Sequence, residues 1–152
     1  MNRTSNKHTI PELEKAFAEG GTRAAVAFLN SLTDRRFTSL YRFDNETLRS
    51  ISFYDRERPE LDTCEDIPVM ASYCVFVRHS GSTFMTSEAR LDERVNGHPK
   101  QNELQSYCGV PLLDRKGNLI GSICHFDFKP GSISALDVEL MEHMAELLQP
   151  GL

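Results

Sequence analysis

The chain has 152 residues, a formal net charge of −5 and a mean hydropathy of −0.40; 39% of its residues are apolar and 26% are charged. A chain of this length buries roughly two thirds of its unfolded surface, so it can fold as one domain without a metal ion or a disulfide. No apolar run approaches the ~18 residues that a membrane-spanning helix needs, and residues 1–10 lack the apolar segment of a secretory signal. We therefore expect a cytoplasmic protein with no membrane partner.

The charge distribution argues against nucleic-acid binding. The first 60 residues carry 10 Lys and Arg against 9 Asp and Glu, and the remaining 92 carry 7 against 13. Binding to a phosphate backbone needs a concentrated basic surface. The densest basic positions are Arg35–Arg36 and the segment 55–58, in which two arginines alternate with two acidic residues. We expect no nucleic-acid partner.

Four cysteines, Cys64, Cys74, Cys108 and Cys124, are predicted to be free thiols. Disulfides are rare in cytoplasmic proteins. The sequence contains no Cys-x-x-Cys pair and no histidine at metal-ligand spacing from these cysteines, so a zinc site has no support.

Periodicity and turn residues predict an α+β fold. The elements expected in chain order are helices over 9–19 and 22–33, strands over 37–43, 48–53, 73–78, 82–87, 106–113 and 118–126, and a last helix from Ser134 to about residue 149. Gly20–Gly21 separate the first two helices, and Ser134 with Asp137 forms a capping box for the last. The order favours a largely antiparallel sheet of about six strands with helices on one side.

Three residues inside the last two strands carry structural information. Gly109 and Gly121 indicate close approach of another backbone or a bulge, and Pro111 indicates an edge or an unpaired position. The polar, aperiodic segment 88–105 precedes these strands, and segments of this kind inside a compact domain are often functional.

Several short patterns, in order along the chain, resemble those of GAF domains. Ser72-Tyr73-Cys74 resembles the Ser-Phe-Cys of the family, and residues 88–94 resemble its Asp-Ala-x-x-Asp-x-Arg. Residues 107–112 are similar to its Tyr-x-Gly-Val-Pro-Leu strand, and residues 120–130 to its Ile-Gly-x-Leu-Cys strand with a following Asp-x-x-Pro. The resemblance extends from about residue 22 to residue 149.

The resemblance implies a GAF-like domain over residues 22–152, preceded by an N-terminal tail and short helix over 1–21. It also implies a ligand pocket between the free face of the sheet and residues 88–105. GAF domains are mostly sensors of small molecules, and their ligands include cyclic nucleotides, haem, bilins, amino acids and small aromatics. Membership therefore leaves the ligand and any cofactor unassigned.

The segment 88–94 contains the best local candidates for a ligand site. Arg94 offers a planar fork for a carboxylate or phosphate, with Asp92 beside it. Alternatively, Asp92 caps a short helix and Arg94 pairs with a nearby acid. The full set of candidate ligand-binding residues is Cys74, Glu88, Asp92, Arg94, His98, Tyr107 and Cys124.

Cys124–His125 resembles a Cys-His pair that lies near the chromophore in bilin-binding relatives. Because neighbouring residues of a strand point to opposite faces, we expect these two side chains to act apart, which disfavours a bilin.

Two alternatives to a sensor without catalytic activity remain open. One GAF lineage, the free methionine-R-sulfoxide reductases, attacks its substrate with a cysteine thiolate and resolves the intermediate with a second cysteine. Cys74, Cys108 and Cys124 lie on three predicted strands that could be neighbours, which would supply such a pair.

The other alternative is an interaction module. Terminal helices pair subunits in many GAF proteins, and Leu140, Met144 and Leu147 could form such a contact or cover the sheet of their own subunit. We expect a homodimer. We also expect it to signal through a partner chain, since the sequence carries no kinase, cyclase or helix-turn-helix segment.

Overall fold

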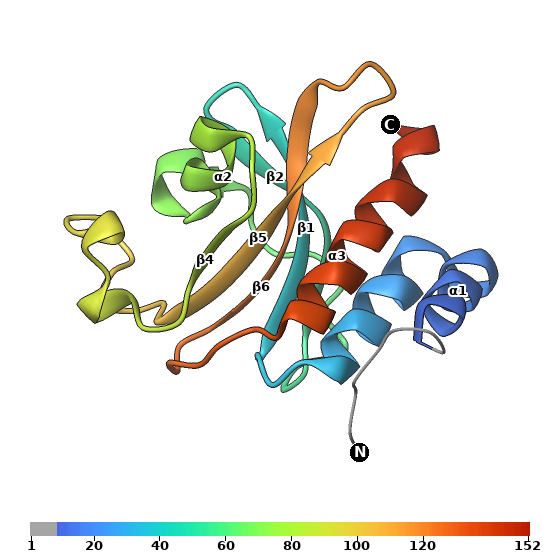
Figure 1. Cartoon of the computed structure of the whole chain (residues 1–152), viewed down its shortest axis with the longest axis horizontal. Helices are drawn as coiled ribbons and strands as arrows, with labels where there is room; N and C mark the ends of the chain where they lie inside the picture. The colour runs from blue at the N-terminus through green and yellow to red at the C-terminus, as the bar shows by residue number, and fades with distance from the viewer. Residues whose placement is uncertain (1–8) are drawn as a thin grey trace.

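The computed structural model describes residues 9–152, and the expected tail over residues 1–8 lies outside them. Six strands form one antiparallel sheet in the order β3-β2-β1-β6-β5-β4 (Figure 1). The strands are β1 (Phe37–Asp44), β2 (Thr47–Asp55), β3 (Ile67–Pro68), β4 (Phe84–Thr86), β5 (Ser106–Leu113) and β6 (Leu119–Asp127). The predicted α+β class is confirmed, and the strands predicted over 37–43 and 48–53 are β1 and β2, which pair antiparallel.

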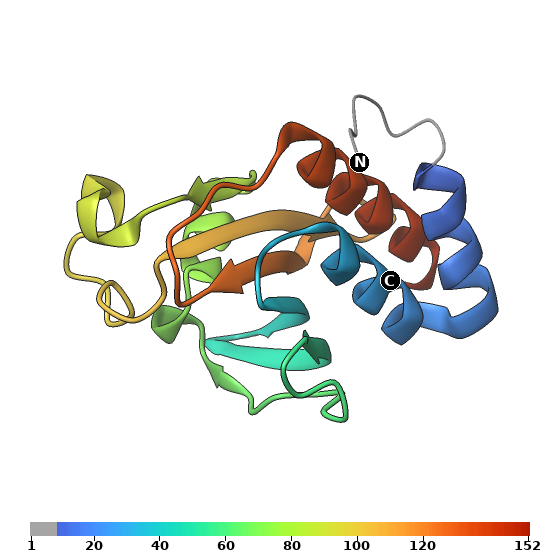
Figure 2. The same cartoon turned by 90° about the horizontal axis from the view of Figure 1, so that it is seen from below.

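Two helices, α1 (Thr9–Leu32) and α3 (Ala135–Leu148), lie side by side over one face of the sheet (Figure 2). The backbone of Gly21 leaves the helical conformation inside α1 (φ 75°, ψ −164°), so the predicted interruption is confirmed. Ser134 caps α3, and its hydroxyl accepts a hydrogen bond of 3.1 Å from the backbone N–H of Asp137. Within residues 9–152, no helix is both long and apolar enough to cross a membrane.

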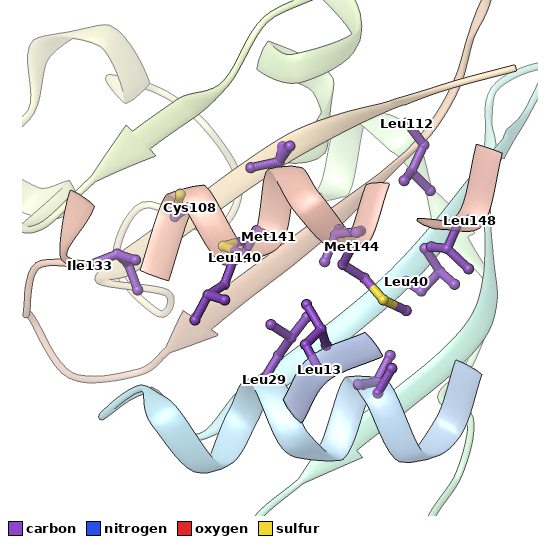
Figure 3. Packing of buried hydrophobic residues seen from close by; sticks show 14 residues of the cluster. Leu13, Leu29, Leu40, Cys108, Leu112, Ile133, Leu140, Met141, Met144 and Leu148 are labelled. Carbon is purple, nitrogen blue, oxygen red and sulfur yellow. The ribbon is translucent and has the colours of Figure 1, made fainter. Parts of the chain in front are cut away.

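The core beneath these helices consists of aliphatic and methionine side chains together with Cys108 (Figure 3). Leu140 and Met144 are 1% and 0% exposed and pack in this core, and Leu147 is partly buried against it. Of the two roles considered for these residues, the structure shows the second: they cover the sheet of their own subunit.

The predicted strand over residues 73–78 is wrong. Residues Cys74–Ser80 form a helix, α2, on the face of the sheet opposite to α1 and α3. Tyr73 and Val77 are fully buried one helical turn apart, and Gly81 ends the helix with a left-handed backbone (φ 70°). The β-branched and aromatic residues favoured a strand, but packing of one helical face against the sheet outweighs that preference.

The glycines inside the last two strands are required by close contacts. A Cβ on Gly121 would lie 2.1 Å from the carbonyl oxygen of Tyr41 on the neighbouring strand, and a Cβ on Gly109 would meet the Tyr107 hydroxyl. Strand β4 pairs with β5 only as far as Gly109, so Pro111 lies beyond the pairing and loses no hydrogen bond. The predictions for Gly121 and Pro111 are confirmed, whereas the close neighbour of Gly109 is the Tyr107 side chain and not another backbone or a bulge.

The segment between β4 and β5 contains only single turns of 3-10 helix, Ala89–Leu91 and Glu93–Val95, and further turns as far as residue 103. Figure 1 shows it extending beyond the edge of the sheet at β4. It therefore adjoins α2 and the sheet face opposite to the two long helices.

Candidate functional site

The sheet face that α2 covers is lined by aromatic side chains and thiols. Tyr41, Tyr107 and Cys124 point from β1, β5 and β6 into one buried cluster with Tyr73 and Cys74 of the α2 region. Side chains thus fill most of the space in which the sequence predicted a ligand pocket.

A cavity of about 60 Å³ remains in this layer. It is lined by Tyr41, Ile67, Ala71, Ser72, Lys100, Leu104, Tyr107 and Phe126. Pockets for small organic ligands have volumes of about 300–1,000 Å³. The cavity therefore has room for a few atoms, and a larger ligand would need α2 or residues 100–104 to move.

Polar groups converge on the Cys74 thiol. The Tyr107 hydroxyl donates a hydrogen bond to Cys74 Sγ over 3.1 Å, and Ser122 Oγ lies 3.2 Å from the same sulfur. Burial by itself would raise the pKa of Cys74, but hydrogen bonds from Cys124, Ser122, Ser72 and Tyr107 outweigh it and lower the pKa below the usual range. Of the two fully buried thiols in this cluster, Cys74 is the one whose pKa is lowered, whereas burial raises the pKa of Cys124.

Gly109 makes the contact between Tyr107 and Cys74 possible. Residues two apart on a strand lie on the same face, and the Tyr107 hydroxyl occupies the space next to Gly109 that a Cβ would fill. The glycine of the Tyr-x-Gly pattern thus lets the tyrosine lie along its own strand, where its hydroxyl reaches α2.

The other cysteines are distributed over both faces. Cys124 lies in the aromatic cluster beside Cys74, whereas Cys108 and His125 point to the face under α1 and α3. Cys64 is half-buried, with its sulfur 3.4 Å from the Tyr41 hydroxyl. All four cysteines are free, and the predicted separation of Cys124 from His125 is confirmed.

Asp92 and Arg94 pair with each other. Asp92 caps the second 3-10 turn by accepting the backbone N–H of Arg94, and its carboxylate accepts two hydrogen bonds of 2.9 and 2.6 Å from the guanidinium. The same guanidinium donates to the carbonyl of Met85 and lies 4.7 Å from the ring centroid of Phe84. The hydrogen bond from Arg94 holds the pKa of Asp92 far below its usual range. The geometry is that of the capping and pairing alternative.

His98 is held as a neutral ring. Its Nδ1 accepts the backbone N–H of Lys100 over 3.0 Å, so the proton is on Nε2, which donates to the carbonyl of Ser72 over 3.1 Å. Partial burial lowers the pKa of His98. The ring lies 4.7 Å from that of Tyr73 and 5.7 Å from that of Phe76, between centroids, so it acts as part of an aromatic wall.

A groove of about 800 Å³ runs between α2 and residues 94–99. It is lined by Met70, Val75, Phe76, Arg78, His79, Arg94, Asn96, Gly97, His98 and Pro99. The lining combines apolar and aromatic side chains with two arginines and contains no carboxylate. Phe76 is supported from behind by Phe84, whose ring centroid is 4.7 Å away.

A second cleft of about 660 Å³ lies on the other side of Arg94 and has the opposite character. Its lining includes the acidic residues Glu88, Asp92 and Glu93, together with hydroxyl groups and exposed apolar side chains. Among the residues that the structure describes, no group of three or more His, Cys, Asp or Glu is placed to hold a metal ion.

The seven candidate residues therefore separate into three places. Cys74, Tyr107 and Cys124 lie in the buried cluster, Glu88 and Asp92 line the acidic cleft, and His98 lines the groove. Arg94 lines both the cleft and the groove. Phe76, Arg78 and Ser122 are not among the residues predicted from the sequence. Gly81, which follows His79-Ser80, is the signal of a helix end that would have placed Phe76 and Arg78 correctly.

The family model for the GAF domain matches residues 20–149. The chain belongs to the GAF domain family. A cyclic di-GMP phosphodiesterase of Pseudomonas aeruginosa is 31% identical over 85 residues, which are 53% of this chain and 14% of that protein. The chain thus matches only a small part of the length of this curated relative.

Solved GAF-fold structures cover nearly the whole chain. The free methionine-R-sulfoxide reductase of Neisseria meningitidis is 18% identical over 93% of this chain and 84% of its own, with a TM-score of 0.72. The GAF domain of a phosphoenolpyruvate-protein phosphotransferase from Acinetobacter is 14% identical over 93% and 89%, with a TM-score of 0.73. At these identities the likeness establishes the fold alone. The same fold occurs in a free methionine-R-sulfoxide reductase and in the GAF domain of a phosphotransferase.

Proposed function

We propose that this GAF domain is a sensor without catalytic activity that binds a small organic anion with a flat apolar body, in the groove between α2 and residues 94–99. The observation that carries the proposal is the lining of that groove, which places arginines at the rim of an aromatic wall and includes no carboxylate. The membership in a family of sensor and ligand-binding domains supports it.

Two features of the groove favour an anion. Arg78 donates to the backbone carbonyl of Asn45 over 2.8 Å and contacts the exposed Glu46 carboxylate at 3.2 Å. Surface ion pairs of this kind contribute little, so a carboxylate or phosphate with two oxygens can replace Glu46 at small cost. Arg94 lies at the opposite rim, where its positive charge is shared with Asp92.

The apolar part of the ligand would lie against Phe76 and His98. Both rings are partly exposed. Because His98 is neutral, its ring can stack against an apolar ring of the ligand. Aromatic contacts of this type contribute about 0.5–1.5 kcal/mol beyond their buried area. The combination favours aromatic acids and nucleoside monophosphates over sugars or amines.

The test is a binding screen in two steps. Thermal shift of the purified chain with aromatic carboxylates, nucleoside monophosphates and neutral isosteres should raise the melting temperature only for anions. Isothermal titration of the best compound should then give an affinity that Arg78→Ala lowers roughly tenfold, the loss expected for one charge-assisted hydrogen bond.

Arg49→Ala is the matched control, because Arg49 is also an exposed arginine that pairs with surface carboxylates, Asp44 and Asp66, outside the groove. It should leave the affinity unchanged. Binding that is insensitive to Arg78→Ala, or equally sensitive to both variants, would place the ligand elsewhere.

A free methionine-R-sulfoxide reductase is the second candidate, favoured by the adjacency of Cys74 and Cys124. Cys108 lies on the other face of the sheet and is therefore unable to resolve an intermediate on Cys74. The 60 Å³ cavity is also too small for the substrate. We expect no NADPH consumption in a thioredoxin-coupled assay with free methionine-R-sulfoxide; turnover that Cys74→Ser abolishes would make the protein a reductase instead.

Pairing of two subunits and a downstream partner protein remain part of the proposed sensor role. Light scattering of the wild-type chain measures the first directly. A dimer would support the homodimer prediction, and a monomer at high concentration would contradict it.

A further inference from the structure

We propose that Cys74 and Cys124 form a dithiol that hydrogen peroxide converts into a disulfide between α2 and β6. The proposal concerns the buried cluster and is independent of ligand binding in the groove. It rests on the adjacency of the two thiols, on the hydroxyl groups around Cys74, and on the small cavity beside them.

The two thiols face each other across the layer between α2 and the sheet. Ser122 and Cys124 are two residues apart on β6 and point to the same face, and Ser122 Oγ lies 3.2 Å from Cys74 Sγ. The Tyr107 hydroxyl that contacts Cys74 Sγ lies beside Gly109, whose cross-strand partner on β6 is Cys124, and both cysteines are fully buried. Neither sulfur has to cross solvent to reach the other.

The surroundings assign different roles to the two sulfurs. Tyr107 and Ser122 aim hydroxyl groups at Cys74, which stabilises its thiolate, the form that attacks a peroxide. Burial and the hydrogen bond to Cys74 raise the pKa of Cys124, so Cys124 keeps its proton until the second step. Cys74 is the attacking sulfur and Cys124 the resolving one.

The cavity of about 60 Å³ is lined by residues that contact Cys74, and we infer that an oxidant approaches the pair through it. It is lined by Tyr107, whose hydroxyl contacts Cys74, and by Ser72, whose hydroxyl accepts the backbone N–H of Cys74. A water molecule needs about 10–15 Å³ of such space, so a molecule with two oxygen atoms fits. Glutathione disulfide is many times larger and is excluded from it.

The reaction balances in two steps. The Cys74 thiolate attacks one peroxide oxygen, the O–O bond breaks, and the leaving hydroxide takes a proton to become water while Cys74 becomes a sulfenic acid. Cys124 then attacks the Cys74 sulfur, and the sulfenic hydroxyl leaves as water with the Cys124 proton. In sum, two thiols and one peroxide give one disulfide and two waters.

The experiment is intact-mass analysis of the wild-type chain before and after hydrogen peroxide, followed by non-reducing digestion. We expect a loss of 2 Da, a peptide pair linked through positions 74 and 124, and recovery of the original mass with dithiothreitol under denaturing conditions. Glutathione disulfide at the same concentration should leave the mass unchanged.

Single substitutions separate this pair from the other thiols. Cys74→Ser and Cys124→Ser should each abolish the loss of 2 Da, whereas Cys64→Ser and Cys108→Ser should retain it. Cys108→Ser is the closest match to the first two, because Cys108 is also fully buried but lies on the other face of the sheet. Circular dichroism shows whether each variant is folded.

The mass and digest of the oxidised wild-type chain show whether Cys74 and Cys124 form a disulfide, even where a variant fails to fold. A disulfide through Cys64 or Cys108, oxygen addition of 16 or 32 Da without a disulfide, or an unchanged mass would each overturn the proposal. Equal oxidation by glutathione disulfide would overturn the role of the cavity. Because methionine sulfoxide is absent from the experiment, its outcome does not depend on the reductase alternative.

Discussion

The two faces of the sheet differ in the side chains that cover them. Under α1 and α3 the strands contribute mainly aliphatic side chains, together with Cys108, that pack with leucines and methionines into one core (Figure 3). Under α2 the same strands contribute tyrosines and thiols, and the cover is a helix of seven residues with short 3-10 turns. The groove, the acidic cleft and the small cavity all adjoin this second cover or the segment after β4.

This division follows from strand geometry. Adjacent residues of β6 alternate, so Ile123 belongs to the helix core and Cys124 to the aromatic cluster. Long amphipathic helices can bury a whole face, whereas a short helix leaves gaps at its ends. The helix face therefore holds the larger aliphatic core, and the α2 face holds the tyrosine–thiol cluster and adjoins the groove.

The largest expected effect is the loss of a side chain from the helix face. Met144→Ala removes a fully buried side chain from the core and should lower the free energy of unfolding by about 2–5 kcal/mol. Met70→Ala is the matched substitution on the other face, where Met70 is 59% exposed. It should change the free energy of unfolding by less than about 0.5 kcal/mol. Urea denaturation measures both; equal losses would contradict the comparison of the two faces.

Acid should destabilise the helix face through His125. Burial lowers the pKa of His125 to about 4, and its Nδ1 lies 2.6 Å from the Thr38 hydroxyl. The unfolded chain binds this proton near pH 6.5, so the stabilising contribution is complete above pH 6.5 and is lost as the pH falls from 6.5 to 4. The expected loss is roughly 3 kcal/mol.

The measurement is urea denaturation at several pH values in that range, with His125→Gln for comparison. The variant should show a flatter dependence on pH, because it removes the group that takes up the proton. A variant that keeps the full slope would show that another group is responsible.

On the α2 face, Tyr107→Phe should have a larger effect on chemistry than on stability. It removes the hydroxyl that donates to Cys74, so the pKa of Cys74 should rise and the rate of peroxide oxidation should fall about tenfold. The expected cost in stability is about 1 kcal/mol.

Tyr73→Phe is the matched control, because the Tyr73 hydroxyl donates to the carbonyls of Lys100 and Leu104 and contacts no thiol. It should leave the oxidation rate unchanged. Quenched-flow oxidation with mass-spectrometric detection gives the oxidation rate of each variant. Equal slowing in the two variants would contradict the role of Tyr107.

The smallest effect is expected for Asp92→Asn at the boundary between groove and cleft. Arg94 is largely exposed, so the lost ion pair should cost under about 1 kcal/mol in stability. The freed guanidinium should then strengthen anion binding in the groove by about threefold. Asp44→Asn removes the shorter of the two ion pairs of Arg49 outside the groove and should leave binding unchanged; titration calorimetry with the anion from the screen measures both variants.

Local rules predicted much of this fold. The interruption at Gly21, the cap at Ser134, the close approach at Gly121 and the opposite orientation of Cys124 and His125 each depend on a few neighbouring residues and on backbone geometry. The capping and pairing alternative for Asp92 and Arg94 was predictable for the same reason, since both partners lie within three residues.

The sequence failed at α2, where two local tendencies conflict. Tyr73-Cys74-Val75-Phe76-Val77 contains β-branched and aromatic residues that favour a strand, and the run is too short for periodicity to decide. The same residues also place Tyr73 and Val77 one helical turn apart. The sheet resolves the conflict, because an apolar face already formed by Tyr41 and Tyr107 is covered by the helical arrangement.

The sequence by itself determined that the chain is an α+β GAF domain with free thiols, because alternation, caps and short motifs act within a few residues. Only the tertiary structure decided that Cys74 faces Cys124 and not Cys108, and that Arg78 and His98 line one groove. These pairs lie 20 to 50 residues apart, and the contact depends on a helix whose formation local preference opposes. Packing against the sheet overrides that preference, and it brings Cys74 and Cys124 together in the buried cluster beneath α2.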